Sequence, residues 1–274
     1  MIESINHLWE LCIKSYSDPR FLYFSVYSVF LSWTLWLVFA LPFLTVKSRF
    51  SGYRIAGRIN SNVLEHRSAI LIAWNFSAQL IVSVLLWPLI SNFSLSLSDR
   101  SGLLLTPVLV TAYLIIDDLL FYFYHRLLHF PGIYGRIHKV HHEYRKSDAM
   151  AAVHFHPLEF LLISTGFLAG PLILGSDVIT FYIWIALRQW IGVSGHCGFA
   201  LPWDPLRLVP GHPGSAFHFQ HHQIPTRNFG LFFSYLDRAV GTYASMDKSN
   251  PLVGPESEQF TDSSTEENRH SSQD

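Results

Sequence analysis

Long runs without a charged side chain are the feature that most limits how this chain can fold. Residues 21–46 contain no charged residue, and a second uncharged run extends from Ser68 to Ser98. A third run, SGLLLTPVLVTAYLII, starts at Ser101 and leads directly into Asp117. Since about 20 apolar residues are enough to cross a hydrocarbon core of roughly 30 Å, these three runs predict transmembrane helices.

A fourth apolar stretch, 160–187, is interrupted by Gly170-Pro171 and by Gly175-Ser176-Asp177. Such interruptions predict two short legs with a bend between them. The loop at 47–58 holds four basic residues and no acidic one, so the positive-inside rule assigns it to the cytosol. The first span then starts on the lumenal side, the second returns to the lumen, and the third reaches the cytosol near Asp117. The fourth stretch must therefore enter the membrane and leave it again as a hairpin.

The sequence therefore predicts an all-α integral membrane protein of about four transmembrane helices in two hairpins, with a cytosolic helical domain. We divide the chain into an N-terminal segment, 1–20, a membrane domain, 21–243, and a polar tail, 244–274, whose composition predicts disorder. The net charge of −1, without a long basic run, argues against nucleic acid as a partner. Two cysteines without a CxxC pair do not support a disulfide framework.

Histidine is concentrated in one half of the chain, where twelve of the fifteen histidines lie between His125 and His222. His125 and His129 are four residues apart. Two further clusters repeat a spacing of three and four residues; they are His138, His141 and His142, and His218, His221 and His222. Because residues at these spacings share a helix face, each cluster can direct its imidazoles at one point. Eight imidazoles are too many for one tetrahedral ion, so we predict two metal ions.

Imidazole binds zinc, copper, iron and nickel, and the spacing alone leaves the metal open. Three other interpretations also remain at this point. A pH-sensing histidine cluster would not need the same spacing twice. A membrane metal transporter or sensor predicts a polar track through the bilayer, and the spans carry almost no charge. A zinc lipid hydrolase needs fewer ligands, an open position and a carboxylate base.

Four motifs, DDLLFYFYHRLLH, HKVHHEY, HFHPLE and HFQHH, resemble in order and spacing the fatty acid hydroxylase/sterol desaturase superfamily. Within it, the nearest resemblance is to the sterol C4-methyl oxidases. The segments NFG at 228–230 and LDRAVGT at 236–242 are similar to the C-terminal ending of these enzymes. The likeness covers about residues 110–243. The third box departs from that branch, because Phe217 and Phe219 stand where those enzymes usually carry a histidine and an acidic residue.

The resemblance implies a membrane-bound non-haem di-iron monooxygenase of the endoplasmic reticulum, with its histidine boxes (117–222) facing the cytosol. It would oxidise a C–H bond of a sterol or triterpenoid with O2. The alternative substrates are a sphingoid, fatty acyl or specialised terpenoid lipid, for hydroxylation or desaturation. No nucleotide-binding fingerprint such as GxGxxG is present, so electrons would pass from NAD(P)H through a partner, which the family implies to be cytochrome b5 and its reductase.

The predicted site residues fall into two sets. The expected metal ligands are the eight clustered histidines and His196, which follows the hairpin and can reach the predicted metal site. They are His125, His129, His138, His141, His142, His196, His218, His221 and His222. Metal-bound imidazoles generally donate their second N–H to an acceptor. The expected supporting residues around the ligands are Asp118, His156, Glu159 and Asp237.

Overall fold

The structure is a computed structural model that describes residues 9–10, 12–55, 62–99, 101–145 and 148–245. The first eight residues of the N-terminal segment and nearly all of the predicted polar tail lie outside these ranges. Nothing in the structure therefore bears on the disorder predicted for that tail.

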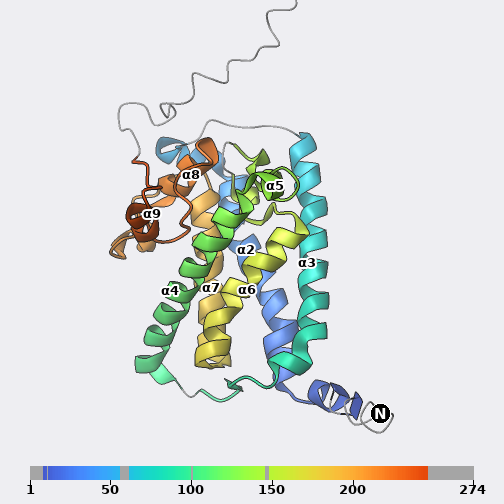
Figure 1. The fold of residues 1–274 in the computed structure, drawn as a ribbon. Coiled ribbons are helices and arrows are strands. Elements are labelled where there is room, and N and C mark those ends of the chain that lie inside the picture. Colours follow the sequence, from blue (N-terminus) through green and yellow to red (C-terminus); the bar gives the residue numbers. More distant parts are fainter. Residues whose placement is uncertain (1–8, 11, 56–61, 100, 146–147, 246–274) are drawn as a thin grey trace, which may run out of the picture.

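Four helices within the described residues are long and apolar enough to cross a membrane, which confirms the all-α membrane class. The first combines a π-helical turn, η1 (Leu22–Tyr27), with α2 (Ser28–Thr45). The others are α3 (Asn62–Ile90), α4 (Gly102–Leu128) and α6 (Pro157–Leu174). Figure 1 shows them side by side with α7 (Val178–His196), with the short helices α5, α8 and α9 at one end of the bundle.

The fourth apolar stretch forms the expected hairpin, but its legs are longer than predicted. Helix α6 has 18 residues and continues through Gly170 and Pro171, so this first predicted interruption is not a break. The chain turns at Gly175, which has a φ of 78°, and α7 adds 19 residues before it ends at His196. At 1.5 Å per residue each leg is about 27 Å long, close to the full depth of a hydrocarbon core.

Gly170 has a packing role that explains why a glycine lies within a continuous helix. A Cβ atom at this position would lie 2.7 Å from the Cα of Tyr113 and 2.8 Å from the Cδ1 of its ring. The absence of a side chain thus lets α6 approach α4 closely. Tyr113 is fully buried, and its hydroxyl donates to the carbonyl of Gly175, so the same contact ties α4 to the bend.

The two interhelical loops at the end of the bundle away from the histidines are joined by a short parallel pairing. Strand β1 (Leu95–Ser96) pairs with β2 (Ser176–Asp177), in the register Leu95 to Ser176. Asp177 caps α7, since its Oδ1 accepts from the Thr180 amide at 2.9 Å. This end of the fold is thereby fixed independently of the histidines.

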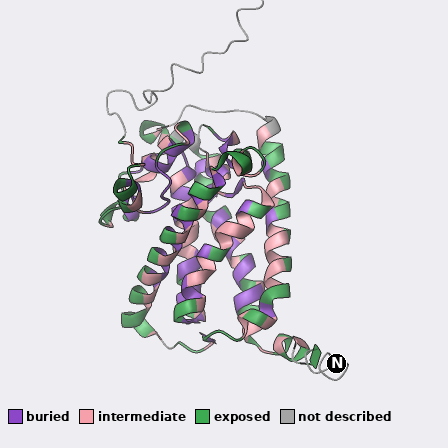
Figure 2. Cartoon of the chain, in the orientation of Figure 1, coloured by how far each residue is buried: buried purple, intermediate pink, exposed green. Residues whose placement is uncertain are grey.

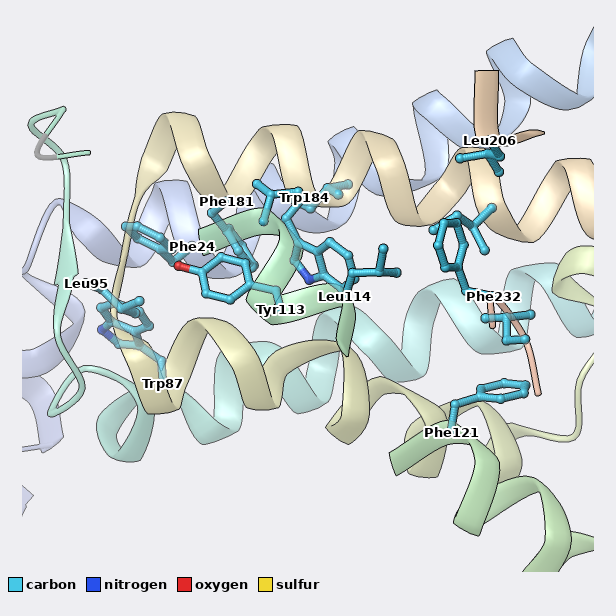
Figure 3. Packing of buried hydrophobic residues seen from close by; sticks show 14 residues of the cluster. Phe24, Trp87, Leu95, Tyr113, Leu114, Phe121, Phe181, Trp184, Leu206 and Phe232 are labelled. Atoms are coloured by element: carbon cyan, nitrogen blue, oxygen red, sulfur yellow. The ribbon is translucent and has the colours of Figure 1, made fainter. Parts of the chain in front are cut away.

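Large aromatic side chains fill the space between the helices. Tyr113, Trp184 and Trp87 are fully buried in one apolar cluster (Figure 3), and the Trp184 indole donates to the Phe167 carbonyl at 3.0 Å. The outward faces of the spans are mostly exposed (Figure 2), and their side chains are apolar, as with Leu103 and Leu104, which are 94% and 90% exposed. These outer faces suit contact with lipid tails.

The end of the bundle that carries the histidines is built from short elements. They are η2 (Lys47–Tyr53), α5 (Pro131–Tyr134), η3 (His138–Glu143), η4 (Ala149–Val153), η5 (Pro205–Leu208), α8 (Ser215–Gln223) and α9 (Tyr235–Val240). The loop that follows α2 is held here, because the Ile55 amide donates to the Gly198 carbonyl at 3.0 Å and the Ala200 amide to the Tyr53 carbonyl at 2.8 Å. The described part of the basic loop, 47–55, therefore lies at the same end as the histidines.

We predict that Gly170→Ala lowers the stability of the protein by about 1–3 kcal/mol, because the added methyl group overlaps the backbone of Tyr113. Alanine in place of glycine inside a helix would otherwise stabilise by roughly 0.5–1 kcal/mol. Thermal unfolding of the detergent-purified protein measures the change. Gly132→Ala is the matched control, since its Cβ would meet nothing within 4 Å; equal melting temperatures for the two variants would contradict the close contact.

Candidate metal centre

Nine histidines, which we call the cage, converge at one end of the bundle. They come from four segments of the chain. The segments are the C-terminal end of α4 and the residue that follows it, η3, the last residue of α7, and α8. They contribute His125, His129, His138, His141, His142, His196, His218, His221 and His222. All are buried except His129, which is half-buried. The nine residues are those expected from the sequence, including His196.

The nine side chains form two groups, and in each group the ligand nitrogens lie within 4.8 Å of one another. The five-histidine group is His125, His129, His138, His142 and His221; the four-histidine group is His141, His196, His218 and His222. This division differs from the expectation that each cluster directs all its imidazoles at one point. Consecutive residues point about 100° apart on an α-helix and about 120° apart on a 3-10 helix. His221 and His222 on α8, and His141 and His142 on η3, therefore reach different groups.

The spacing of the ring nitrogens within each group fits ligands that share an ion. In the five-histidine group, the Nε2 atom of His138 lies 3.1 Å from that of His125 and 3.1 Å from that of His142. The His141 and His196 Nε2 atoms of the other group are 3.3 Å apart. Metal–imidazole bonds of about 2.1 Å at right-angled to tetrahedral geometry separate neighbouring nitrogens by ~3.0–3.4 Å.

Backbone carbonyls determine which nitrogen of four imidazoles carries the proton. The His125 Nδ1–H donates to the Phe229 carbonyl at 2.7 Å, and the His221 Nδ1–H donates to the Arg227 carbonyl at 2.6 Å. The His196 Nδ1–H donates to the Gly192 carbonyl at 2.7 Å, and the His141 Nδ1–H donates to the His154 carbonyl at 3.3 Å. A carbonyl can only accept, so in a neutral ring Nε2 is left with its lone pair facing the group. Lone pairs directed at one another are stabilised by a cation between them.

The remaining histidines of the four-histidine group give a second indication of fit. Both ring nitrogens of His218 and of His222 are buried without a hydrogen-bond partner among the described residues. Buried polar atoms usually have a partner, and a metal ion would supply one. The donor set thus fits two ions held by imidazole.

Burial keeps these imidazoles neutral, which is the form that binds a metal. Desolvation lowers the pKa of His138, His141 and His142 well below its usual value, and neighbouring histidines lower it further. The same causes lower the pKa of His218, His221 and His222. Protons therefore do not compete with a metal in this cage near neutral pH.

Glu159 is the supporting residue that contacts a cage imidazole directly. It lies in the first turn of α6, is fully buried, and its Oε1 is 2.6 Å from Nδ1 of His138. His156 has a different position from the one expected, because its Nδ1 accepts from the Leu158 amide at 3.2 Å and caps α6. His156 therefore helps to start the helix that carries Glu159.

Asp118 and Asp237 hold a backbone loop rather than an imidazole, which corrects the direct contact expected for them. Asp118 Oδ1 accepts from the amides of Phe232 and Phe233 at 2.9 and 3.1 Å. Asp237 accepts from the Phe229 and Gly230 amides at 2.9 and 2.8 Å. Since the Phe229 carbonyl accepts from His125, the two carboxylates act on the cage through this loop.

An ion pair inside the bundle was not predicted. Arg188 of α7 donates from Nε to Oδ2 of Asp117 on α4 at 2.6 Å, and Asp117 is only 2% exposed. On the same helix as Arg188, the Trp190 indole donates to Asp204 Oδ1 at 3.1 Å. The signal was present in the sequence: charges inside apolar helices pair with each other, and each of the two helices offers one of opposite sign.

A chamber extends from the cage into the helix bundle. Five cage histidines line it together with aromatic and aliphatic side chains, among them Trp33, Phe121, Phe155, Phe160 and Ile163. The space between these atoms is about 890 Å³. An apolar molecule in this chamber would lie against both histidine groups, because the chamber contacts His125 and His138 of one and His141, His196 and His218 of the other.

Comparisons with known proteins show which proteins the chain resembles in sequence. The sequence profile described as fatty acid hydroxylase matches residues 110–242. A very-long-chain aldehyde decarbonylase of Oryza sativa subsp. indica is 30% identical over 250 residues, 87% of this chain and 92% of that protein. Methylsterol monooxygenase 2-2 of Arabidopsis thaliana is 29% identical over 255 residues, 88% and 93% of the two chains.

Two Dictyostelium discoideum proteins, provisionally named methylsterol monooxygenases, are 36% identical over 152 residues, which is 54% of this chain. The chain spans 56% and 57% of their lengths. No solved structure matches the chain. The profile matches the part of the chain that holds the histidine boxes, and one relative is 30% identical across 92% of its length. The chain therefore belongs to the fatty acid hydroxylase family.

Proposed function

We propose that this protein is a membrane-bound non-haem di-iron monooxygenase that oxidises a C–H bond of a lipid, with a sterol or triterpenoid as the substrate class. The observation that carries the proposal is the pair of buried histidine groups beside an apolar chamber. The three relatives named as methylsterol monooxygenases support the substrate class. A long linear lipid is the second candidate, favoured by the aldehyde decarbonylase that the chain matches over 92% of its length.

The five-histidine and four-histidine groups would each hold one iron ion. When bound, the two ions would let O2 accept two external electrons and two protons, so that one oxygen atom enters a C–H bond and the other leaves as water. No side chain has to act as a nucleophile in such a reaction. The protein's own contribution is to hold nine neutral imidazoles, to orient the lipid and to keep water away from the site.

Orientation of the lipid follows from the shape of the chamber. Its walls near the cage are formed by Phe121 from α4, Phe155 from the loop before α6, and Phe160 and Ile163 from α6. Aromatic and aliphatic walls favour a hydrocarbon over water, and they would hold one carbon of the lipid against the histidines. Because α2, α4, α6 and α7 all line the chamber, its far end extends between the membrane-spanning helices, where a bilayer lipid resides.

The source of electrons is proposed to be NAD(P)H, through cytochrome b5 and its reductase. Exposed cations surround the cage end, namely Arg126, Arg136, Lys139, Arg145 and Arg227. Among the described residues from 119 to 245, no aspartate or glutamate is exposed. This face suits an acidic redox protein. By the positive-inside rule the same charges support a cytosolic position for the cage, as expected for an enzyme of the endoplasmic reticulum.

Metal content tests the proposal most directly. We expect about two irons per chain in protein purified anaerobically in detergent, measured by elemental mass spectrometry. His141→Ala and His221→Ala each remove a ligand from a different group, and both should lose iron and abolish turnover while membrane insertion is unchanged. His66→Ala is the matched control, since His66 is an exposed histidine of α3 outside both groups. Iron and turnover retained in either cage variant would refute the di-iron assignment.

A second prediction concerns Glu159, which receives the Nδ1–H of His138. Glu159→Leu removes the acceptor and should lower iron affinity roughly 10- to 100-fold, the usual cost of losing a partner of a metal-bound histidine. Glu159→Gln keeps an oxygen at the same position and should retain most of the affinity. Titration of the metal-free proteins with ferrous iron compares the three forms. Equal affinities in all of them would show that the contact does not orient His138.

A further inference from the structure

A second chamber continues the first one along the helices. This lower chamber contains about 1030 Å³ of empty space between α2, α3, α6 and α7. Its lining is largely hydrocarbon, with Phe24, Val29, Val82, Leu86, Leu168 and Phe181 as examples. The two chambers share four lining residues, Ser32, Gln79, Ser164 and Phe167. The upper chamber, beside the cage, and the lower, apolar chamber therefore adjoin at these side chains.

The junction between the chambers is polar, although the walls on either side are mostly apolar. Four side chains, which we call the polar girdle, form two hydrogen-bonded pairs there. The Trp33 indole donates to Gln79 Oε1 at 2.7 Å, and Gln189 Nε2 donates to the Ser32 hydroxyl at 2.6 Å. Ser32 and Trp33 are neighbours on α2, so the two glutamines, from α3 and α7, flank one point of that helix.

The girdle retains hydrogen-bonding capacity that the protein does not use. An indole N–H can only donate, which fixes the amide oxygen of Gln79 toward Trp33 and leaves its NH2 group for another partner. Among the described residues, no acceptor for Gln79 Nε2 and no donor to Gln189 Oε1 is found. Polar groups in an apolar environment are costly unless they are paired, so a free donor and a free acceptor here can bind a ligand that carries an oxygen atom.

The girdle lies at a defined depth below the cage. Helix α7 lines the upper chamber, beside the cage, with Gln189, Gly192 and His196. Gln189 and His196 are seven positions apart, which corresponds to about 10 Å along α7. A polar group bound at the girdle would thus lie within about 10 Å of the carbon that meets the histidines.

We propose that Gln79 and Gln189 form a substrate subsite that hydrogen-bonds a hydroxyl or similar uncharged oxygen of the lipid, and thereby selects which carbon reaches the cage. The inference rests on the proposed function, since it assumes that the cavity holds a lipid for oxidation. An uncharged group is specified because the nearby Arg188 is paired with Asp117 and is not free to bind an anion. The rest of the lipid would extend into the lower chamber.

Binding of matched lipid pairs tests this subsite. The probes are radiolabelled lanosterol and its 3-deoxy analogue, and octadecanol and octadecane for a linear substrate, bound to the protein in lipid nanodiscs. One hydrogen bond should give the wild type a roughly five- to tenfold preference for the hydroxylated member of at least one pair. Gln79→Leu and Gln189→Leu should each reduce that preference to less than about twofold.

Controls separate the subsite from folding and from catalysis. The preference is a ratio and does not depend on the folded fraction of a variant. Ser83→Ala removes one partner of another polar pair, since Ser83 lines the lower chamber and bonds Ser25 at 2.8 Å; it should keep the wild-type preference. His141→Ala should keep the preference too, although it abolishes turnover.

Each outcome decides between the two proposals. Equal binding within both lipid pairs by the wild type, or an unchanged preference in both glutamine variants, overturns the subsite. A preference that depends on the glutamines in a protein without iron or turnover supports the subsite and refutes the monooxygenase. A cage that holds iron and oxidises lipids with no role for the glutamines supports the proposed function alone.

Discussion

The mutual approach of imidazole nitrogens is the constraint on which the rest of this structure depends. Nε2 atoms about 3 Å apart, such as those of His125 and His138 at 3.1 Å, repel unless a cation lies between them. Backbone carbonyls prevent the rings from relieving this by changing tautomer, because the Phe229 carbonyl fixes the proton of His125 on Nδ1. The fold must therefore hold the carbonyls as accurately as the rings. Asp118 and Asp237 contribute to this, because they accept hydrogen bonds from backbone amides of the loop that carries Phe229.

The transmembrane helices supply that accuracy through one buried ion pair. Asp117 and Arg188 are joined at 2.6 Å, and each lies eight residues before a cage histidine, His125 on α4 and His196 on α7. Those two histidines belong to different groups. A charge pair inside a bundle is costly to break, so it fixes the relative height of the two helices, and with it the distance between the two proposed ions.

Much of this arrangement follows from the sequence, because it depends on local periodicity. Uncharged runs locate the spans, and the three histidine clusters locate the ligands. The supporting contacts depend on tertiary structure and were harder to predict. Asp118 has the spacing of a partner for His125, yet it accepts from the amide of Phe232, 114 residues away. Gly170 resembled a helix break because its reason for being glycine, the contact with Tyr113, is on another helix.

The same division between local and tertiary determinants applies to substrate choice. The cage is formed at helix ends by short-range spacing, whereas the cavity below it is bounded by α2, α3, α6 and α7 together. Residues of the cavity can change without disturbing a ligand, because the girdle is about two helical turns from His196 on α7. Relatives with different named substrates, a sterol and a long-chain aldehyde, match this chain at similar identity. In this chain, the walls of the cavity can therefore vary while the histidines of the cage stay in place.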